Sequence, residues 1–208
     1  TKDNFEIQDT HRYEKLLKLS GGDYQAFLYD CDGTLADNMH AHKQTYVKVA
    51  AQHGVTIDPA IVDEFAGLPI PAVVVEINKR YKSSFDPVAF ERAKSELFYH
   101  EFIAETKPVQ FVVDHLVAHA GKVKIGVVSG GTTKMIRKTL EVLQIDHLVE
   151  VLVCAGDTAK GKPFPDPFLL AAEKLGVAPD RCLVFEDGEP GVQAAESAGM
   201  RWVRVDQV

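Results

Sequence analysis

The sequence lacks any run of about 20 apolar residues, the length that a membrane-spanning helix needs. Its first residues, TKDNFEIQDTHRYEKLL, contain no hydrophobic stretch of the kind that a signal peptide carries. It also has no excess of basic charge, because 23 lysines and arginines stand against 30 aspartates and glutamates, for a net charge of −7. We therefore expect neither a membrane nor a nucleic acid as a partner, and any site for an anion must be built locally.

Cysteine is scarce, and its pattern excludes a disulfide framework. Cys31, Cys154 and Cys182 lie in apolar, strand-like surroundings without C-x-x-C spacing. An odd number of widely spaced cysteines is typical of a protein whose thiols stay reduced. The sequence therefore predicts a cytoplasmic protein.

What the 208 residues do contain is the alternating pattern of an α/β protein. Short, continuous apolar runs indicate strands buried on both faces, and helical segments separate them. The expected strands are 25–29, 122–128, 149–154, 181–185 and 201–205, and the expected helices are 107–119, 133–144, 167–176 and 191–199. This order predicts a doubly wound, parallel-sheet, Rossmann-like core, with its site at the carboxyl ends of the strands.

Strands and helices do not alternate in segment 38–106. Its pattern predicts an inserted helical domain of about four helices. Asp58-Pro59 and Asp86-Pro87 are helix start signals, and Gly54 is a stop signal. The run VVVEI (73–77) could also be a strand. The predicted domains are an N-terminal extension with a short helix (1–23), an α/β core (24–37 and 107–208) and the helical insertion (38–106).

Two aspartates follow the first expected strand in YDCDGTLAD (29–37). Residues two apart in a strand point to the same side, so Asp30 and Asp32 are expected on one side and Cys31 on the other. Two like charges so close are unfavourable alone. They make sense around a cation, or as a nucleophile beside a proton carrier.

The next two strand ends carry candidate phosphate ligands. Ser129 and Gly130 lie between the second strand and a helix that starts near Thr132, where a hydroxyl and backbone N–H groups favour an anion. The alternative is a capping serine in a glycine turn. Lys162, between Gly161 and Pro163, is a fixed ammonium on a stiff loop. The alternative there is a solvated lysine beside a proline turn.

The fourth strand ends in Glu186 and Asp187. Adjacent carboxylates of this kind suit Mg²⁺, although Asp187 could instead cap the next helix. All four motifs fall at strand ends of one parallel sheet, where its topology places a site. Coincidence does not explain that convergence.

Taken in order, these motifs resemble those of the haloacid dehalogenase superfamily of aspartate-nucleophile phosphotransferases. The matching residues are DCDGTL (30–35), the strand end at Ser129, GKP (161–163) and EDGEPGVQAAESAGM (186–200). The helical insertion resembles the cap domain of the subgroup that contains β-phosphoglucomutase and small sugar-phosphate phosphatases.

The resemblance implies a role for each motif. Asp30 would attack phosphorus to form an aspartyl-phosphate, and Asp32 would act as proton donor and then base. Asp30, the Asp32 carbonyl and Asp187 would hold Mg²⁺, with Glu186 nearby or bonding through water. The remaining groups, Ser129, Gly130 and Lys162, would bind the phosphoryl oxygens.

In the cap, the resemblance matches His42 and Lys94 to polar positions that face the substrate. A solvated helix face is the alternative for each. The sequence indicates that His40, His115 and His119 are surface residues. The last two share a helix face but have no third metal ligand nearby.

Together with the resemblance, these features predict a Mg²⁺-dependent phosphatase that hydrolyses a small phosphorylated metabolite, and a sugar phosphate is the expected class. A β-phosphoglucomutase-type mutase is the runner-up, but GLPIPAVV (67–74) offers Ile70 where the mutase pattern has a phosphate-gripping arginine. Asp32 argues against a dehalogenase, which needs no leaving-group acid. A phosphonate-cleaving relative would need a Schiff-base lysine, for which Lys43, Lys48 and Lys94 are available.

A non-catalytic phospholigand-binding protein is the alternative from another class, but such a protein would not need the second aspartate. The sequence leaves the oligomeric state open and is compatible with a monomer.

Overall fold

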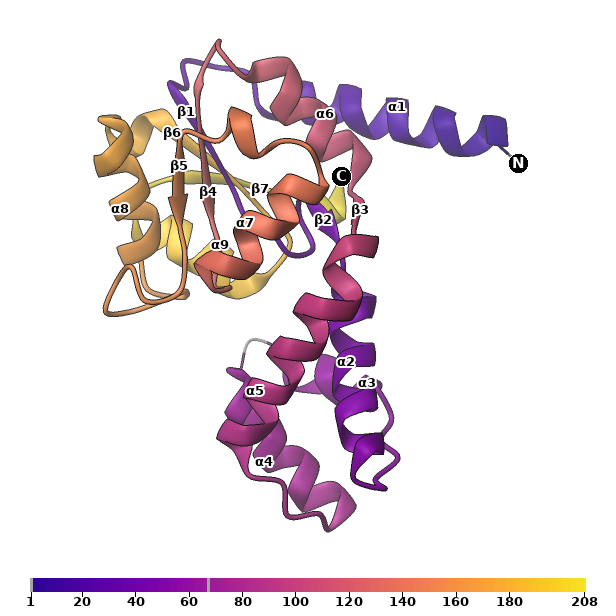
Figure 1. The fold of residues 1–208 in the computed structure, drawn as a ribbon. Helices are drawn as coiled ribbons and strands as arrows, with labels where there is room; N and C mark the ends of the chain where they lie inside the picture. Colours follow the sequence, from indigo (N-terminus) through magenta and orange to yellow (C-terminus); the bar gives the residue numbers. More distant parts are fainter. Residues whose placement is uncertain (1, 67) are drawn as a thin grey trace. The chain divides into compact units, whose positions relative to one another are not determined.

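The computed structural model describes residues 2–66 and 68–208, which divide into two compact units. The core unit comprises the chain up to Asp37 together with Thr106–Val208. The helical unit is Asn38–Glu105. Both are drawn as ribbons in Figure 1.

A five-stranded sheet forms the centre of the core unit and confirms the predicted doubly wound α/β fold. Its order is β5-β4-β1-β6-β7, and every neighbouring pair is parallel. The strands are β1 (Ala26–Tyr29), β4 (Lys124–Val128), β5 (Val151–Val153), β6 (Cys182–Glu186) and β7 (Arg201–Arg204). Each of them coincides with an expected strand.

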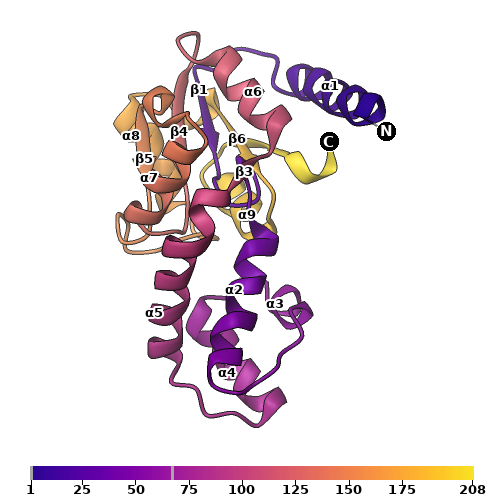
Figure 2. The same ribbon diagram turned by 45° about the vertical axis from the view of Figure 1, so that its right-hand side comes forward.

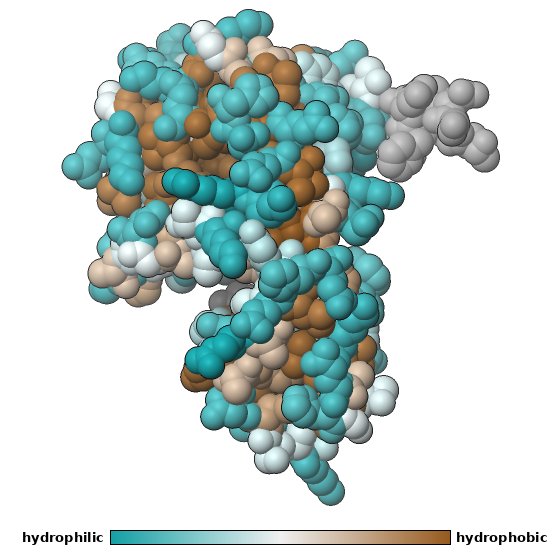
Figure 3. Space-filling model, in the orientation of Figure 1, coloured by the Kyte–Doolittle hydropathy of each residue, from teal (hydrophilic) through white to brown (hydrophobic). Residues whose placement is uncertain are grey.

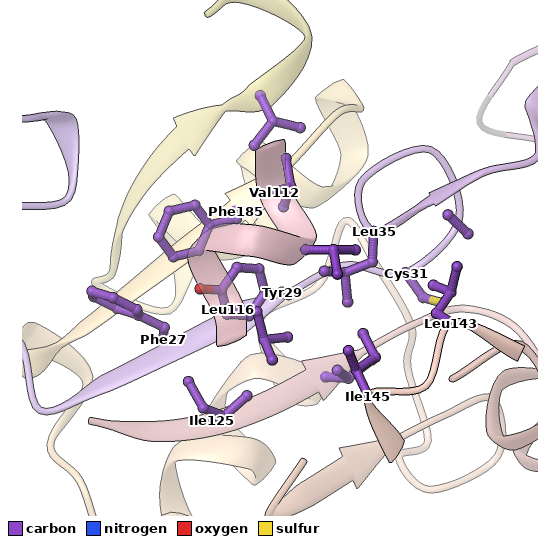
Figure 4. Close-up of a cluster of buried hydrophobic side chains, with 14 of the residues drawn as sticks. Phe27, Tyr29, Cys31, Leu35, Val112, Leu116, Ile125, Leu143, Ile145 and Phe185 are labelled. Carbon is purple, nitrogen blue, oxygen red and sulfur yellow. The ribbon is translucent and has the colours of Figure 1, made fainter. Parts of the chain in front are cut away.

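Helices cover both faces of the sheet, because alternate residues of β1 belong to two separate apolar clusters. Phe27 and Tyr29 pack with side chains of α1 (Lys2–Leu19), α6 (Gln110–His119) and α7 (Thr133–Val142), as the close-up in Figure 4 shows in part. Ala26 and Leu28 pack with α8 (Asp166–Leu175) and α9 (Glu189–Ser197). Burial on both faces explains why the strands are apolar without alternation.

A short antiparallel ribbon marks where the chain leaves the core unit and returns to it. It pairs β2 (Ala36–Asp37) with β3 (Lys107–Pro108). The insertion therefore follows β1 by only a few residues. The loop between β1 and β2 is short, which holds Asp30 and Asp32 close to the sheet.

The N-terminal helix is longer than the short helix expected there, and it packs on α6 within the core unit. Figures 1 and 2 both show α1 lying beside α6. Leu16 is fully buried in the apolar cluster of that face. One buried leucine in a polar helix is too weak a sequence signal to indicate docking.

The prediction that His115 is a surface residue is wrong. His115 is fully buried, its Nε2 lies 2.8 Å from Ser20 Oγ, and its Nδ1 lies 2.7 Å from Tyr29 Oη. Its ring stacks on Phe27 with 5.3 Å between centroids. Two hydroxyl partners satisfy the imidazole, which allows a polar ring in the interior. His40 is exposed as expected, and His119 is half-buried.

The described residues of the helical unit, 38–66 and 68–105, form four α-helices around an apolar cluster of their own. They are α2 (Met39–Gln52), α3 (Ala60–Glu64), α4 (Ile70–Tyr81) and α5 (Pro87–Leu97), followed by a π turn (Phe98–Phe102) and a 3₁₀ turn (Ile103–Glu105). Val73, Val74 and Ile77 point into this cluster at helical spacing, so VVVEI is helix and not strand. Asp86 caps α5 by accepting from Val88 N and Ala89 N.

Hydrophilic side chains cover much of the visible face of each unit in Figure 3, as expected for a chain in which 25% of the residues are charged. Among the described residues, no helix combines the length and apolar character needed to cross a bilayer.

Candidate active site

The candidate active site lies where β1, β4 and β6 end. Asp30 directly follows β1, and its N–H donates to the carbonyl of Phe185 at 2.9 Å, which extends the ladder between β1 and β6 by one bond. Glu186 is the last residue of β6, and Ser129 follows β4. Because these strands are parallel neighbours, their carboxyl ends deliver all three residues to the same edge.

Lys162 connects all three of these strand ends. Its Nζ donates to Asp30 Oδ1 at 2.9 Å, to Glu186 Oε2 at 2.7 Å and to the Val128 carbonyl at 2.9 Å. The side chain is only 13% exposed, which excludes the alternative of a solvated lysine. Burial by itself lowers the pKa of Lys162, but the two carboxylates outweigh that effect and raise it overall. Lys162 therefore stays charged.

Asp187 is connected to Asp30 through Thr34. The Thr34 hydroxyl lies 3.1 Å from Asp30 Oδ2 and 3.1 Å from Asp187 Oδ1. A hydroxyl has one proton, so it donates to one of these carboxyl oxygens at a time. Gly188, not Asp187, occupies the cap position of α9, and no side chain caps that helix. The capping alternative for Asp187 therefore fails.

Glu186 is held by backbone donors from the loop that follows it. Its Oε1 accepts from Asp187 N at 3.1 Å and from Gly188 N at 3.3 Å. Gly191 on α9 packs so closely that a Cβ there would collide with the Glu186 carboxylate. A glycine is required here because the helix backbone must approach an acidic side chain.

Negative charge accumulates at this edge of the sheet. Burial, followed by repulsion from Asp30, raises the pKa of both Glu186 and Asp187, although Lys162 partly offsets the effect at Glu186. Each of Asp30, Glu186 and Asp187 offers one carboxylate oxygen, and these three atoms lie within 4.8 Å of one another. We call these three residues the acidic cluster.

The acidic cluster fits a hard divalent cation. Carboxylate oxygens are the donors that Mg²⁺ prefers, and it usually takes only one or two of them together with waters and phosphate oxygens. The Glu186 and Asp187 carboxyls are removed from water and repelled by Asp30, so their charged forms are disfavoured without a further cation. A cation at this position would stabilise those charged forms.

Asp32 and Cys31 differ in environment. Asp32 is half-buried at the start of the turn and bridges to Ala36. Cys31 is fully buried in the apolar cluster, and burial raises the pKa of its thiol. The burial of Cys31 agrees with the expectation that its side chain points away from the site. All three cysteines are free thiols.

The Ser129 turn follows β4, the neighbour of β1, and the serine side chain is buried. Ser129 N donates to the Val153 carbonyl, and its Oγ accepts from Gly131 N at 3.1 Å. Thr132 is the residue that caps α7, through a bond to Met135 N. Ser129 is therefore not the helix cap, and its hydroxyl proton can donate to another acceptor. Gly130 has open space where a Cβ would lie.

The predicted cap residues His42 and Lys94 lie together within the helical unit. Lys94 Nζ is 3.2 Å from His42 Nδ1, and it lies over the rings of Tyr46 and Phe98 at 5.1 and 5.4 Å from their centroids. Lys94 is 3% exposed, so the solvated-face alternative fails for it. The His42 ring stacks on Phe98 with 4.0 Å between centroids.

The other two lysines considered for a Schiff base form ion pairs within the helical unit. Lys43 pairs with Asp63, and Lys48 pairs with Glu101.

Three residues of the site were not predicted from the sequence: Thr34, Gly191 and Arg204. Thr34 and Gly191 lie inside the quoted motifs DCDGTL and EDGEPGVQAAESAGM, so their positions were visible but their contacts were not. Arg204, whose Nη2 donates to the Asp187 carbonyl at 3.0 Å, carries no motif signal. Only strand register brings it to the site.

Comparisons with known proteins agree with this geometry. A family model described as haloacid dehalogenase-like hydrolase matches residues 27–205. Fructose-1-phosphate phosphatase YqaB of Escherichia coli is 31% identical over 185 residues, which are 88% of this chain and 96% of that protein. β-Phosphoglucomutase of Bacillus subtilis is 26% identical over 191 residues, covering 88% and 84% of the two chains.

Among solved structures, CbbY of Rhodobacter sphaeroides in complex with xylulose-(1,5)bisphosphate has the same fold. It superposes with a TM-score of 0.74 at 22% identity, and the match covers 86% of this chain and 84% of that one.

Proposed function

Because the chain belongs to the haloacid dehalogenase-like hydrolases, as its motifs led us to expect, we propose that it is a Mg²⁺-dependent phosphatase of a small phosphomonoester. The observation that carries the proposal is the acidic cluster, with Lys162 bonded to two of its three members. Phosphoryl transfer depends mainly on positioning and charge neutralisation, and this arrangement supplies both.

In the first step, a carboxylate oxygen of Asp30 attacks phosphorus. The bond from phosphorus to the ester oxygen breaks, and Asp32 gives its proton to that oxygen, so the alcohol leaves neutral. This route splits a difficult hydrolysis into two easier steps. The half-buried position of Asp32, two residues from Asp30, supports its role as the proton carrier.

In the second step, water attacks the aspartyl-phosphate. Asp32 takes a proton from that water, the bond from phosphorus to Asp30 breaks, and inorganic phosphate and free Asp30 result. Lys162 and the Ser129 hydroxyl, with the backbone at Gly130, hold the phosphoryl oxygens throughout. The charged, buried state of Lys162 supports this role.

Asp30, the Asp32 carbonyl and Asp187 are the proposed ligands of Mg²⁺, with Glu186 nearby. When bound, the ion would supply positive charge that offsets the carboxylates and the phosphoryl group.

A sugar phosphate is the proposed substrate class, and His42 and Lys94 are the proposed specificity residues. The Escherichia coli relative, a fructose-1-phosphate phosphatase, supports the class. The pair of Lys94 and His42 is a preformed polar group beside the apolar cluster of the helical unit, which suits recognition of hydroxyl groups.

A β-phosphoglucomutase-type mutase is the second candidate, favoured by the Bacillus subtilis relative. A mutase must hold two phosphates, and Ile70, the first residue of α4, offers no charge for the distal one. Gly67, from which that segment was matched, lies outside the described residues. The absence of an arginine at Ile70 favours hydrolysis.

The test is phosphate release from a panel of hexose, pentose, polyol and nucleotide monophosphates, with Mg²⁺ and with a chelator. We expect metal-dependent release, fastest with a sugar or polyol phosphate. A parallel assay adds a hexose bisphosphate to glucose 1-phosphate. If glucose 1-phosphate is isomerised and not hydrolysed, the proposed function is wrong and the protein is a mutase.

A further inference from the structure

Arg204 lies at the edge of the candidate active site although no motif contains it. It is the last residue of β7, and the strand register pairs it with Glu186 at the end of β6. The carboxyl ends of parallel strands share an edge, so the Arg204 side chain begins beside the acidic cluster. Its side chain is 18% exposed.

The Arg204 guanidinium is held by the Asp206 carboxylate and donates a hydrogen bond to the backbone carbonyl of Asp187. Its Nε and Nη2 donate to Asp206 Oδ1 and Oδ2 at 2.8 and 2.7 Å, which is the two-pronged geometry that fits a carboxylate. Nη2 also donates to the Asp187 carbonyl at 3.0 Å, and Nη1 lies 3.4 Å from Glu189 Oε2. Asp206 therefore anchors the arginine while the arginine holds Asp187.

Both backbone polar groups of Asp187 are thus hydrogen-bonded to side chains. Its N–H donates to Glu186 Oε1, and its carbonyl accepts from Arg204. Asp187 sits between the end of β6 and the start of α9, one residue beyond the last pair of the ladder between β6 and β7. A carboxylate that must point at a cation needs its backbone fixed, because a small rotation there moves the ligand oxygen away.

We infer that Arg204 is a positioning residue for the metal ligand Asp187, an inference that rests on the proposed function. Arg204 itself touches no reacting atom. It fixes the Asp187 peptide, and Asp206 fixes Arg204. A glutamine at this position would lose the fork to Asp206, and Asp187 would reorient.

The test measures metal affinity without turnover. Free Mn²⁺ is quantified by electron paramagnetic resonance as Mn²⁺ alone is titrated into the protein, and Mg²⁺ is then added to displace it. We expect Arg204→Gln to weaken Mn²⁺ binding about tenfold, the usual effect of losing an outer partner of a metal ligand. Arg204→Lys keeps the positive charge but loses the two-pronged contact with Asp206. Its Mn²⁺ affinity should lie between those of the wild type and Arg204→Gln. Asp206→Asn should weaken binding in the same direction by a smaller factor.

Arg201→Gln is the matched control, because Arg201 is an exposed arginine at the opposite end of the same strand. It should bind Mn²⁺ like the wild type. Melting temperatures are recorded for each variant. If Arg204→Gln does not fold, Arg204→Lys and Asp206→Asn decide the question.

The outcomes separate the two proposals. If the wild type binds Mn²⁺ and Asp187→Asn abolishes binding, the metal site stands. Unchanged affinity in the Arg204 and Asp206 variants would then overturn the positioning role alone. If the wild type does not bind Mn²⁺, or binds it equally well in Asp187→Asn, the proposed metal site is wrong. The role of Arg204 is then wrong as well.

Discussion

At the scale of single residues, Lys162 is the side chain whose charge partly offsets the acidic cluster. It is bonded to Asp30 and Glu186 and is nearly buried. Removing one partner of a buried ion pair leaves an uncompensated charge, which costs more than the pair contributes. Its role in stability and its proposed role in phosphate binding therefore overlap.

Lys162→Met should lower the free energy of unfolding by about 3 kcal/mol in chelator. It should also lower kcat about 100-fold or more, because a fixed cation for the phosphoryl group is lost. Urea unfolding and phosphate release measure the two effects. Lys160→Met, two residues away at an exposed position, is the control. Full activity in Lys162→Met would remove this residue from the catalytic set.

At the scale of elements, the close contact between α9 and the end of β6 sets the position of Glu186. Gly191 makes that contact possible because it has no side chain. The remaining contacts of Glu186, with Lys162 and with the two backbone N–H groups that follow it, depend on the same position.

Gly191→Ala should destabilise the protein by about 1–3 kcal/mol and reduce kcat, because either the helix or the Glu186 carboxylate must move. Thermal unfolding and phosphate release are the measurements. Gln193→Ala, at an exposed position of the same helix, should change neither. An alanine at 191 that leaves both values at the wild-type level would show that the contact has no consequence.

A second element-scale feature is the buried hydrogen-bonded chain that joins α1, α6 and β1. Ser20 follows α1, His115 is on α6, and Tyr29 ends β1 one residue before Asp30. Burial, with a smaller effect from His119, lowers the pKa of His115 from 6.5 to about 3. Burial also raises the pKa of Tyr29, so these facing groups are neutral.

This predicts a pH dependence of stability. Between pH 6.5 and about 3, the unfolded chain binds a proton at His115 that the folded chain does not. Stability from this residue is complete above pH 6.5 and is lost as the pH falls toward 3. By pH 5 the loss is about 2 kcal/mol.

His115→Gln should remove this part of the pH dependence, whereas the exposed control His147→Gln should retain it. The measurement is the free energy of unfolding in urea at pH 7.5 and pH 5 for all three proteins. A wild type and a His115→Gln variant that lose equal stability over this range would show that His115 is protonated in the folded state.

At the scale of the whole molecule, the strands and the four candidate strand ends could be predicted because they depend on local patterns. Continuous apolar runs predicted β1, β4, β5, β6 and β7, and the motifs predicted that Asp30, Lys162 and the Glu186–Asp187 pair would lie at one edge of the sheet. The bond from Lys162 to Glu186 across the sheet could not be predicted, because it depends on loop geometry.

The features that could not be predicted from the sequence, the positions of Arg204 and His115, depend on strand register and on burial. Arg204 lies beside Glu186 only because β7 pairs with β6 at that register. His115 is buried only because two hydroxyls from distant segments satisfy its ring. Neither feature has a local signature, since each is decided by residues far away along the chain.

The division into two units separates the proposed chemistry from the proposed specificity. Lys94→Ala should lower kcat/KM for a sugar phosphate about tenfold, roughly the value of one hydrogen bond to a charged group, and change that for an aryl phosphate less. The comparison is the ratio of the two kcat/KM values. Lys79→Ala, an exposed lysine of the same unit, should leave the ratio unchanged. Equal losses on both substrates would exclude Lys94 from the specificity residues.

The central claim is that Asp30 carries out metal-dependent phosphate release, and one comparison tests it most directly. Phosphate release from the preferred sugar phosphate is measured for the wild type and Asp30→Asn, each with Mg²⁺ and with chelator, beside the exposed control Asp37→Asn. We predict release only with Mg²⁺, equal in the wild type and the Asp37 variant, and abolished in folded Asp30→Asn. Substantial release by Asp30→Asn, or release that persists in chelator, would contradict the account.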